Sequence, residues 1–571
     1  MIFVLLALIA LTLAHLQVIR GSYFRRQGKN NALRMIPFEG ERGRILDRNG
    51  KVLADVTESW VAALIPQDLA KEGDVFLFLA EVLGEGRRTL ERRFEAGRLS
   101  PFSPVTVSGP LTRDQAIRIE EGAYLHPGLV VMRRFARRYP AGEVTSHLLG
   151  YVAKPDAERM RRAAREGLNA EEPVGYAGAE EAFEPFLRGE PGGRQIEVDS
   201  RGRQVRLVSM REPGQGQDLT LSVDLQVQRA AFEALGGERG AVAIIDPDTG
   251  EVLALVSSPA YDPNAFVLPG SRSKVGGYLS DPRAPLFNRA LSASFPPGSL
   301  FKIPVAVAAL EEKKIKPATT FDCPGTFEIG GRVFRSPHAW GRQDLFQAMG
   351  HSANEYFFHS GLRVGPDQMA RYARLLGLGE RTGDGLWQEN RGNIPSRSSR
   401  MRWFKGDTVN MSIGQGDVLV TPLQIARMMA AFANGGHLVR TRLLKAVDGK
   451  IGTVPIFSKN RDSPYFPTVS SVKISLRDDT WKALKQALYA PVRMPDGTAR
   501  LLDMSGFDTF GKTGTAQAGA GKSDHAWFAG VTRTSKGRIA YCLLLEHGGS
   551  STNAVAAVKR MLERLMQEGV L

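Results

Sequence analysis

The chain has 571 residues, of which 43% are hydrophobic and 24% are charged. That length is too great for one hydrophobic core, so we expect two or three domains. The composition is that of a globular protein and argues against a disordered chain or a polytopic membrane protein. The net charge of +15 favours polyanionic surroundings such as anionic lipid headgroups or an acidic extracellular polymer. The basic residues are spread along the chain without a recognition motif, so we expect no nucleic-acid partner.

Residues 1–19 form an apolar N-terminal segment that is slightly shorter than the roughly 20 residues of a full membrane span. Basic residues follow it and none precedes it, which by the positive-inside rule alone would place the rest of the chain in the cytoplasm. We instead expect an uncleaved anchor whose cytoplasmic tail is missing from this sequence. The alternative is a cleaved signal peptide, but the basic n-region and the small-residue cleavage site are absent.

Residues 20–216 are expected to form a mainly-β platform that lacks a nucleophile–base pair. Asn49-Gly50 is a strong signal for a two-residue hairpin turn. A charged, helix-prone stretch follows over residues 68–122, and Gly- and Arg-rich segments come after it. The Pro- and Gly-rich run 213–216 reads as the linker to a second domain over residues 217–571.

The second domain is predicted to be α+β, with a central antiparallel sheet flanked by helices. Residues 219–235 read as a strand followed by a helix, and residues 240–258 as two apolar strands joined by a turn at 247–250. Two more apolar strands lie near the C-terminus, at 525–531 and 539–546. The chain closes with a helix of 3.6-residue apolar period. Both ends of the domain would then contribute to one sheet.

Ser299 and Lys302 are the first pair of residues that indicates chemistry. The break Pro296-Pro297-Gly298 precedes them and an apolar helix is expected to begin at once, which puts both side chains on one helical face. A serine hydroxyl needs a base to become a nucleophile, and a lysine can serve when burial and nearby positive charge lower its pKa. The free N–H groups of a helix start can stabilise an oxyanion.

An S-x-x-K pattern alone is weak, because it also occurs at Ser271 to Lys274 and at Ser470 to Lys473. Either copy is adequately explained as solvated side chains on the surface. Only the Ser299 copy follows a Pro-Pro-Gly break and leads into an apolar helix. Pro304 lies slightly late for a helix start, so we expect a lost backbone bond and a bend there.

Ser352 and Asn354 form the second element, an S-x-N pattern. Two further copies, Ser458 to Asn460 and Ser551 to Asn553, look like turn or helix-cap residues. After the Ser352 copy, the aromatic run 356–358 is expected to anchor a buried helix and to leave the two polar side chains at a cleft.

Lys512-Thr513-Gly514 forms the third element and occurs once, just before a predicted strand. We expect it on an edge strand, where Gly514 lets a ligand backbone approach. Lys512 and Thr513 suit a carboxylate, and the N–H of Thr515 could complete an oxyanion hole with that of Ser299. The alternative is a solvated lysine that protects an exposed strand edge.

Taken together, the order S-x-x-K, S-x-N, K-T-G resembles that of the penicilloyl-serine transferases, which include penicillin-binding proteins and serine β-lactamases. The resemblance extends to segments outside the three motifs. RGRILDRNG (42–50), RRYPAGEVTSHLLGYV (137–152) and GYAGAEEAFEPFLRG (175–189) look like the N-terminal pedestal of class B penicillin-binding proteins. Residues 407–436 are similar to the segment between the second and third motifs of that class.

Within the class, residues 393–416 and 512–530 look most like the elongation type, penicillin-binding protein 2, and the division-type synthase is the nearer alternative. Ala353 departs from the family, where many relatives carry Asp or Cys. Some elongation-type members are thought to bind zinc near this region. Asp322, Cys323 and His338 lie nearby in the sequence, but the full ligand set does not align, so we expect no metal and no cofactor.

The resemblance implies a peptidoglycan D,D-transpeptidase. Ser299 would attack the penultimate D-Ala of a stem peptide, Lys302 would take its proton, and Ser352 would relay protons. Asn354 and Lys512 would orient the substrate, and Thr513, Gly514 and Thr515 would hold its carboxylate and peptide edge. A second stem peptide would resolve the ester. β-Lactams would acylate Ser299 as substrate mimics.

The implied location is the inner membrane, with a single pass and the catalytic domain on the outer side. The implied partners are stem peptides on lipid-linked nascent glycan, and a membrane glycan polymerase of the shape, elongation, division and sporulation family. Three rival functions stay open: a D,D-carboxypeptidase or β-lactamase that uses water as acceptor, a β-lactam receptor, and a non-catalytic scaffold.

Overall fold

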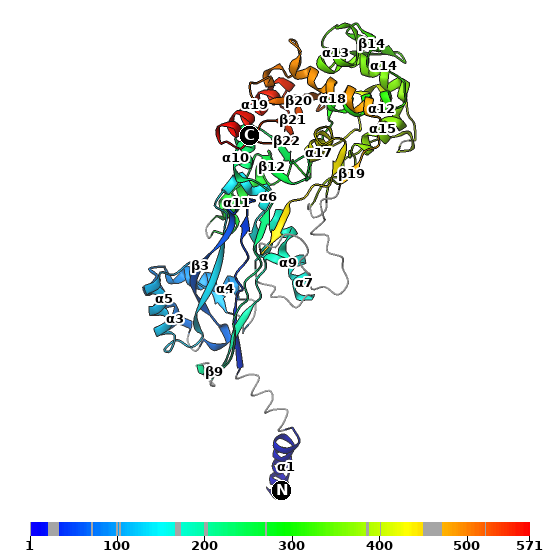
Figure 1. The fold of residues 1–571 in the computed structure, drawn as a ribbon. Coiled ribbons are helices and arrows are strands. Elements are labelled where there is room, and N and C mark those ends of the chain that lie inside the picture. Colours follow the sequence, from blue (N-terminus) through cyan, green and yellow to red (C-terminus); the bar gives the residue numbers. More distant parts are fainter. Residues whose placement is uncertain are drawn as a thin grey trace. The chain divides into compact units, whose positions relative to one another are not determined.

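The computed structural model describes residues 2–20, 33–69, 72–98, 101, 104–165, 173–198, 204–268, 271–383, 388–399, 401–448, 471–519 and 521–571. The chain forms two compact units, and neither is one continuous segment (Figure 1). The first unit comprises Met1–Arg44, Asp55–Arg138 and Pro185–Gln217. The second comprises Ile45–Ala54, Tyr139–Glu184 and Asp218–Leu571.

The first unit combines strands and helices. One antiparallel sheet has the order β1 (Leu33–Phe38), β8 (Gly192–Val198), β9 (Gln204–Arg211). In another, β3 (Val52–Leu64) pairs with both β5 (Leu129–Arg138) and β4 (Val105–Thr106). The helices predicted over residues 68–122 are present as α3 (Glu72–Leu83), α4 (Arg87–Gly97) and α5 (Arg113–Gly122). Their apolar sides share a core with β3, β4 and β5.

The N-terminal helix α1 covers Ile2–Ala14, and a π-helical turn follows it at His15–Ile19. The apolar side chains of α1 are exposed, with Phe3 at 86% and Leu11 at 71%. Within the described residues, no helix has both the length and the apolar character needed to cross a membrane.

The second unit is built on one antiparallel five-stranded sheet, as predicted, and the two ends of the domain supply its strands. The strand order is β12 (Val252–Ser258), β11 (Gly240–Ile245), β22 (Arg538–Leu545), β21 (His525–Arg533), β20 (Asp508–Ala516). Every neighbouring pair is antiparallel. Strand β20 therefore lies at an edge, with one side of its backbone unpaired within the sheet.

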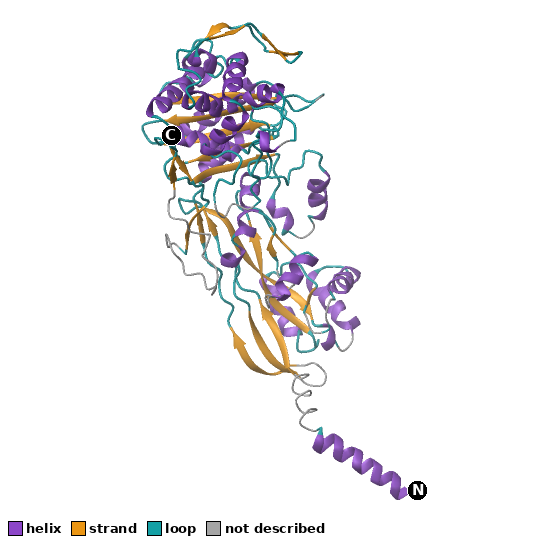
Figure 2. Cartoon of the chain, turned by 90° about the vertical axis from the view of Figure 1, so that its right-hand side faces the viewer, coloured by secondary structure: helices purple, strands orange, loops and turns teal. Residues whose placement is uncertain are grey.

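Helices cover both faces of this sheet (Figure 2). On one face, α10 (Leu225–Leu235) and α19 (Ser551–Gln567) pack against alternate strand residues such as Val242 and Leu543. On the other face, α17 (Pro422–Ala433) contacts β11, β21 and β22. Such a two-faced sheet needs apolar residues on both sides, which explains the continuous apolar runs in the sequence.

A mainly helical region is inserted in the sequence between β12 and β20. Its helices contact one another in the pairs α12 with α14 and α15, α14 with α16, and α13 with α18. They are α11 (Arg272–Ser280), α12 (Lys302–Glu311), α13 (Leu345–Gly350), α14 (Asn354–Val364), α15 (Pro366–Leu375), α16 (Lys405–Ser412) and α18 (Asp478–Arg493). The short strands here are β13 (Phe321–Cys323), β14 (Thr326–Ile329), β15 (Arg332–Arg335), β16 (Gly341–Gln343), β17 (His437–Val439), β18 (Leu444–Val447) and β19 (Ser471–Lys473).

The hairpin predicted at Asn49-Gly50 is present, but its loop is longer than two residues. Strand β2 (Ile45–Leu46) pairs with β3, with Leu46 opposite Val52, so the loop spans 47–51. The carboxylate of Asp47 accepts the N–H groups of Asn49 and Lys51, both at 2.8 Å. These two hydrogen bonds satisfy backbone N–H groups of the longer loop.

The remaining short helices and strands of the second unit are α6 (Ser146–Leu149), α7 (Ala157–Arg165), α8 (Gly178–Ala182), β6 (Val152–Ala153), β7 (Val174–Gly175) and β10 (Leu219–Leu221), and α9 (Glu184–Leu187) begins at the unit boundary.

Replacing Leu562 with alanine should destabilise the protein, because this α19 side chain is fully buried between the sheet and α10. A buried Leu→Ala change leaves a cavity and lowers the free energy of unfolding by about 2–5 kcal/mol. The urea midpoint, followed by tryptophan fluorescence, measures it. Met566→Ala is the control on the same helix, since Met566 is 49% exposed. Equal midpoints for the two variants would contradict this packing.

Candidate active site

Ser299 lies in a 3₁₀ turn, Gly298–Phe301, and the α-helix begins only at Lys302. The expectation that the α-helix starts at the Pro-Pro-Gly break is therefore wrong by one turn. Pro304 is the third residue of α12, which continues to Glu311. The lost backbone bond and the bend stay predictions. The Ser299 side chain is half-buried, and it has no hydrogen-bond partner among the described residues.

The Ser299 turn is packed tightly against strand β20. Gly298 has a φ of +54°, and a Cβ placed on it would lie 2.3 Å from the carbonyl oxygen of Thr515. A Cβ on Gly514 would lie 2.7 Å from the carbonyl oxygen of Pro297. The Gly298 N–H donates to the carbonyl of Gly414 at 3.1 Å. Glycine is thus required on both sides of the contact, because any side chain would push the turn and the strand apart.

Lys302 links the first motif to the second. Its side chain is 0% exposed. Its Nζ donates to the carbonyl of Ser352 at 2.7 Å, to the hydroxyl of Ser352 at 3.1 Å and to Oδ1 of Asn354 at 2.7 Å. Three acceptors match the three hydrogens of an ammonium group. A buried charge is tolerated only when it is hydrogen-bonded in this way.

Ser352 occupies an unusual backbone conformation just before α14. Its φ is +58°, which is uncommon for a residue with a side chain and is found in strained functional sites. Asn354 is the first residue of α14, and Tyr356, Phe357 and Phe358 that follow are buried, as expected. The aromatic anchor fixes the helix, and the turn aims both the carbonyl and the hydroxyl of Ser352 at Lys302.

The third motif lies on edge strand β20, as predicted. Lys512 is 0% exposed, so it is not the solvated edge lysine of the alternative interpretation. Its Nζ lies near the carbonyl and the hydroxyl of Thr513, at 3.3 and 3.4 Å. The Thr513 hydroxyl donates to that of Thr498 at 2.9 Å. Thr515 is exposed, and Gln415 Nε2 donates to its carbonyl at 3.4 Å.

Both lysines have lowered pKa values. Burial lowers the pKa of Lys302 well below its usual 10.5; the positive charge of Lys512 lowers it further, and Glu355 opposes the shift. Burial lowers the pKa of Lys512 to about 7. Desolvation disfavours the charged form of an amine, so both lysines lose their protons more readily than an exposed lysine does. Such amines are suited to general-base work, and clustered shifts of this kind mark functional sites.

The other copies of the short patterns lie elsewhere. Lys274 pairs with Asp262 at 3.1 Å on the surface, and Lys473 lies on strand β19. Ser470, Ser458 and Asn460 lie outside the described residues. Ser551 and Asn553 begin α19, and Asn553 donates to the carbonyl of Gly548 at 2.8 Å. Among the copies that the structure describes, only those of Ser299 and Ser352 come together with the Lys512 motif.

Sequence reasoning missed three residues of this site. Glu355 is fully buried, and neither of its carboxylate oxygens has a hydrogen-bond partner among the described residues. Thr498 contacts the third motif from 15 residues before Thr513, and Gln415 contacts it from 100 residues before Thr515. The Gly-Gln-Gly run at 414–416 marks a tight turn and was the one available signal for Gln415. Nothing local distinguishes Thr498.

The described residues contain no group of three or more His, Cys, Asp or Glu side chains placed to hold a metal ion. Cys323 and Cys542 are both buried and unpaired with each other. Cys542 lies on strand β22 of the central sheet.

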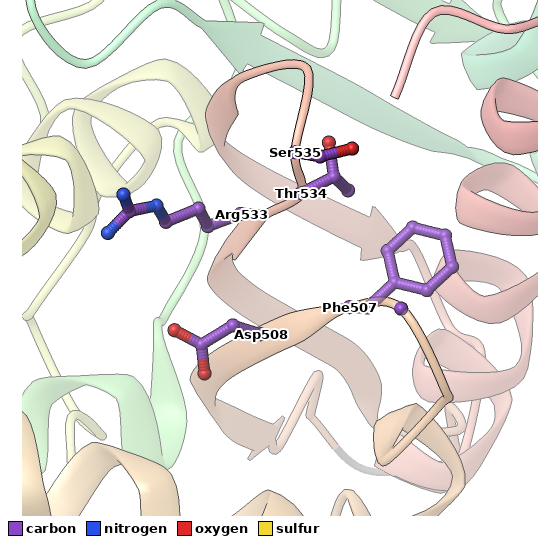
Figure 3. Close-up of a pocket in the computed structure, with 6 residues that line it drawn as sticks. Phe507, Asp508, Arg533, Thr534 and Ser535 are labelled. Carbon is purple, nitrogen blue, oxygen red and sulfur yellow. The ribbon is translucent and has the colours of Figure 1, made fainter.

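A surface hollow of about 440 Å³ lies at the other end of β20 from Thr515 (Figure 3). Phe507, Asp508, Arg533, Thr534 and Ser535 line it together with Gly506. It has no lysine to activate a nucleophile, so the chemistry belongs to the Ser299 region.

Comparison with known proteins identifies the family. The family described as "Penicillin binding protein transpeptidase domain" matches residues 240–567, and "Penicillin-binding Protein dimerisation domain" matches residues 37–221. The chain belongs to the penicillin-binding protein transpeptidase family. The similar proteins are peptidoglycan D,D-transpeptidases. They confirm both the predicted resemblance to class B members of elongation type and the predicted function.

Three of these similar proteins match nearly the whole chain. Peptidoglycan D,D-transpeptidase MrdA of Haemophilus influenzae is 30% identical, over 97% of this chain and 88% of that protein. A solved structure titled "Structural coordination of polymerization and crosslinking by a peptidoglycan synthase complex" contains a chain 31% identical, covering 99% and 97%, with a TM-score of 0.73. Penicillin-binding protein PBP2 of Helicobacter pylori, solved in complex with MreC, is 26% identical, covering 94% and 100%, with a TM-score of 0.78.

Gly298→Ala should slow acylation by a penicillin about 100-fold, because displacing reacting groups by roughly 1 Å has effects of that size. The added Cβ would collide with the Thr515 carbonyl and move the Ser299 turn. Gly237→Ala is the matched control, since Gly237 also has a positive φ, +80°, but nothing lies within 4 Å of the added carbon. The rate of labelling with a fluorescent penicillin measures both variants. Equal rates would contradict the close packing of turn and strand.

Proposed function

We propose that this transpeptidase cross-links stem peptides through an ester on Ser299 during cell-wall elongation. The observation that carries the proposal is the buried amine of Lys302, hydrogen-bonded to Ser352 and Asn354. Lys302 is the first residue of α12, directly after the turn that contains Ser299. That turn packs against the strand that carries Lys512. A nucleophile, a base with a lowered pKa and a peptide-binding strand edge are the parts that serine acyl transfer needs.

In the acylation step, the Ser299 oxygen bonds to the penultimate D-Ala carbonyl, and its proton passes to neutral Lys302. A neutral amine keeps two hydrogens, which suit the carbonyl of Ser352 and Oδ1 of Asn354, because both of these atoms only accept. Its lone pair is then available to a hydroxyl, that of Ser352 or of Ser299. Ser352 can therefore relay the proton to the leaving amine, and the C–N bond breaks to release the terminal D-Ala.

Strand β20 is proposed to bind the donor peptide as an added strand. Its edge has unpaired backbone groups, and Thr515 is exposed there. Lys512 and Thr513 would bind the terminal carboxylate, and Gly514 would allow close approach. The N–H groups of Ser299 and Thr515 would stabilise the oxyanion. The amine of a second stem peptide then attacks the ester, forms the cross-link and frees Ser299.

We further propose an anchor in residues 1–19 that holds the catalytic unit outside the inner membrane. The exposed apolar side chains of α1 support this, because such a helix needs a non-aqueous covering. The partner proposed is a membrane glycan polymerase, in line with the related chain solved in a peptidoglycan synthase complex. β-Lactams are expected to acylate Ser299, and carboxypeptidase activity is expected only when water replaces the acceptor amine.

Incubation of the full chain with lipid-linked nascent glycan should yield cross-linked dimers, measured by HPLC-MS of the released muropeptides. Ser299→Ala should abolish both the dimers and the labelling by fluorescent penicillin, because no ester can form. Ser271→Ala, in the unused S-x-x-K copy, should leave both unchanged. Trimmed monomers without dimers would contradict transfer and indicate hydrolysis. Labelling that survives in Ser299→Ala would contradict the assignment of the nucleophile.

A further inference from the structure

His351, the residue before Ser352, is held on both sides of its ring. Its Nδ1 lies 2.7 Å from Oε1 of Gln343, and its Nε2 lies 2.9 Å from Oδ2 of Asp496. The ring stacks on Trp340, with centroids 4.1 Å apart and planes 5° apart. The side chain is only 8% exposed. Trp340 and Gln343 from one segment and Asp496 from another therefore fix the ring in position and in rotation.

The hydrogen bonds of Gln343 define which of its side-chain atoms faces His351. The Nε2 of Gln343 donates to the carbonyls of Trp340 at 2.9 Å and Arg342 at 3.3 Å, so its Oε1 faces His351 as an acceptor. The oxygen of Asp496 is also an acceptor. Both ring nitrogens of His351 therefore face an oxygen atom that can accept a hydrogen bond. The imidazole thus bridges β16 to the loop after α18.

That loop also reaches the third motif. Two residues beyond Asp496, Thr498 donates from its N–H and its hydroxyl to the carbonyl of Gly350, each at 3.3 Å. The Thr498 hydroxyl accepts from Thr513 at 2.9 Å. Asp496 and Thr498 therefore both contact the turn before Ser352, and Thr498 also contacts the Lys512 strand.

We propose that His351 is a positioning residue that, with Asp496, sets the place of the Ser352 turn relative to the Lys512–Thr515 strand. Ser352 needs such support because its φ is +58°, a conformation that persists only when its surroundings enforce it. Without the clamp, the Ser352 carbonyl and hydroxyl would no longer be held at Lys302. The inference rests on the proposed function, since it assumes that Ser299 is acylated with Lys302 as base.

The test is the limiting rate of acylation at saturating fluorescent penicillin, measured on the full chain together with the final labelled fraction. His351→Ala and Asp496→Ala should each slow the limiting rate of acylation about tenfold, less than the roughly hundredfold loss expected when a reacting group is misplaced by about 1 Å. The double variant should also be about tenfold slower, because the two residues act as one unit. The labelled fraction should stay that of wild type. Asp496→Ala removes the acceptor of His351 at a side chain that is 57% exposed, so it tests the clamp even if His351→Ala fails to fold.

Asp503→Ala is the matched control, because this aspartate of the same region pairs with Arg493 and Arg500 and does not contact His351. Its rate should equal that of wild type. Unchanged rates in both single variants would overturn the proposal. A reduced labelled fraction at an unchanged rate would also overturn it, because that result indicates a purely structural role. A double variant about a hundredfold slower would overturn it too, because that is the product of two independent effects. Failure of the wild type to label at Ser299 would instead overturn the proposed function, and the clamp with it.

Discussion

The burial of the Lys302 amine is the constraint on which the rest of the site depends. An amine that is 0% exposed can be kept only if the protein supplies the hydrogen bonds that water would have made. Ser352 and Asn354 supply all three. Because those acceptors come from the start of α14, the positions of α12 and α14 are fixed relative to each other. The same burial lowers the pKa of the amine and so makes it a usable base.

Lys512 on strand β20 is subject to the same constraint. Lys512 is also fully buried, and its charge pushes the pKa of Lys302 down further, whereas Glu355 pushes it up. A second positive charge is tolerable beside the first because burial lowers the pKa of Lys512 to about 7. An incoming carboxylate would stabilise the charged form of Lys512. Binding of the donor peptide and readiness of the base are therefore electrostatically coupled.

Much of the architecture could be predicted because it follows from local patterns. Apolar runs and turn residues predict four of the five strands, the K-T-G motif predicts the edge strand, and the 3.6-residue period of α19 predicts the closing helix. The three motifs could be singled out by order and context. The turn geometry could not: no pattern shows that Ser352 takes a positive φ or that α12 starts only at Lys302. These features are imposed by packing against β20 and α14.

Contacts from distant segments were also beyond sequence reasoning. Asp496 and Thr498 lie more than a hundred residues beyond Ser352, and only the folded chain brings them to the turn before it. Likewise, residues 45–54 and 139–184 fold with the second unit although the first unit's segments surround them in the chain. Long-range pairing of this kind leaves no periodic signal in the amino-acid sequence.

The pH dependence of acylation tests the central claim most directly. Lys302 accepts the serine proton only as a neutral amine, so the acylation rate should rise with pH through the apparent pKa of the coupled Lys302 and Lys512 pair. Because both pKa values are lowered from 10.5, the rate of labelling by fluorescent penicillin should level off well below that pH. A rate that continues to rise through pH 10.5, as for an ordinary exposed lysine, would contradict the account.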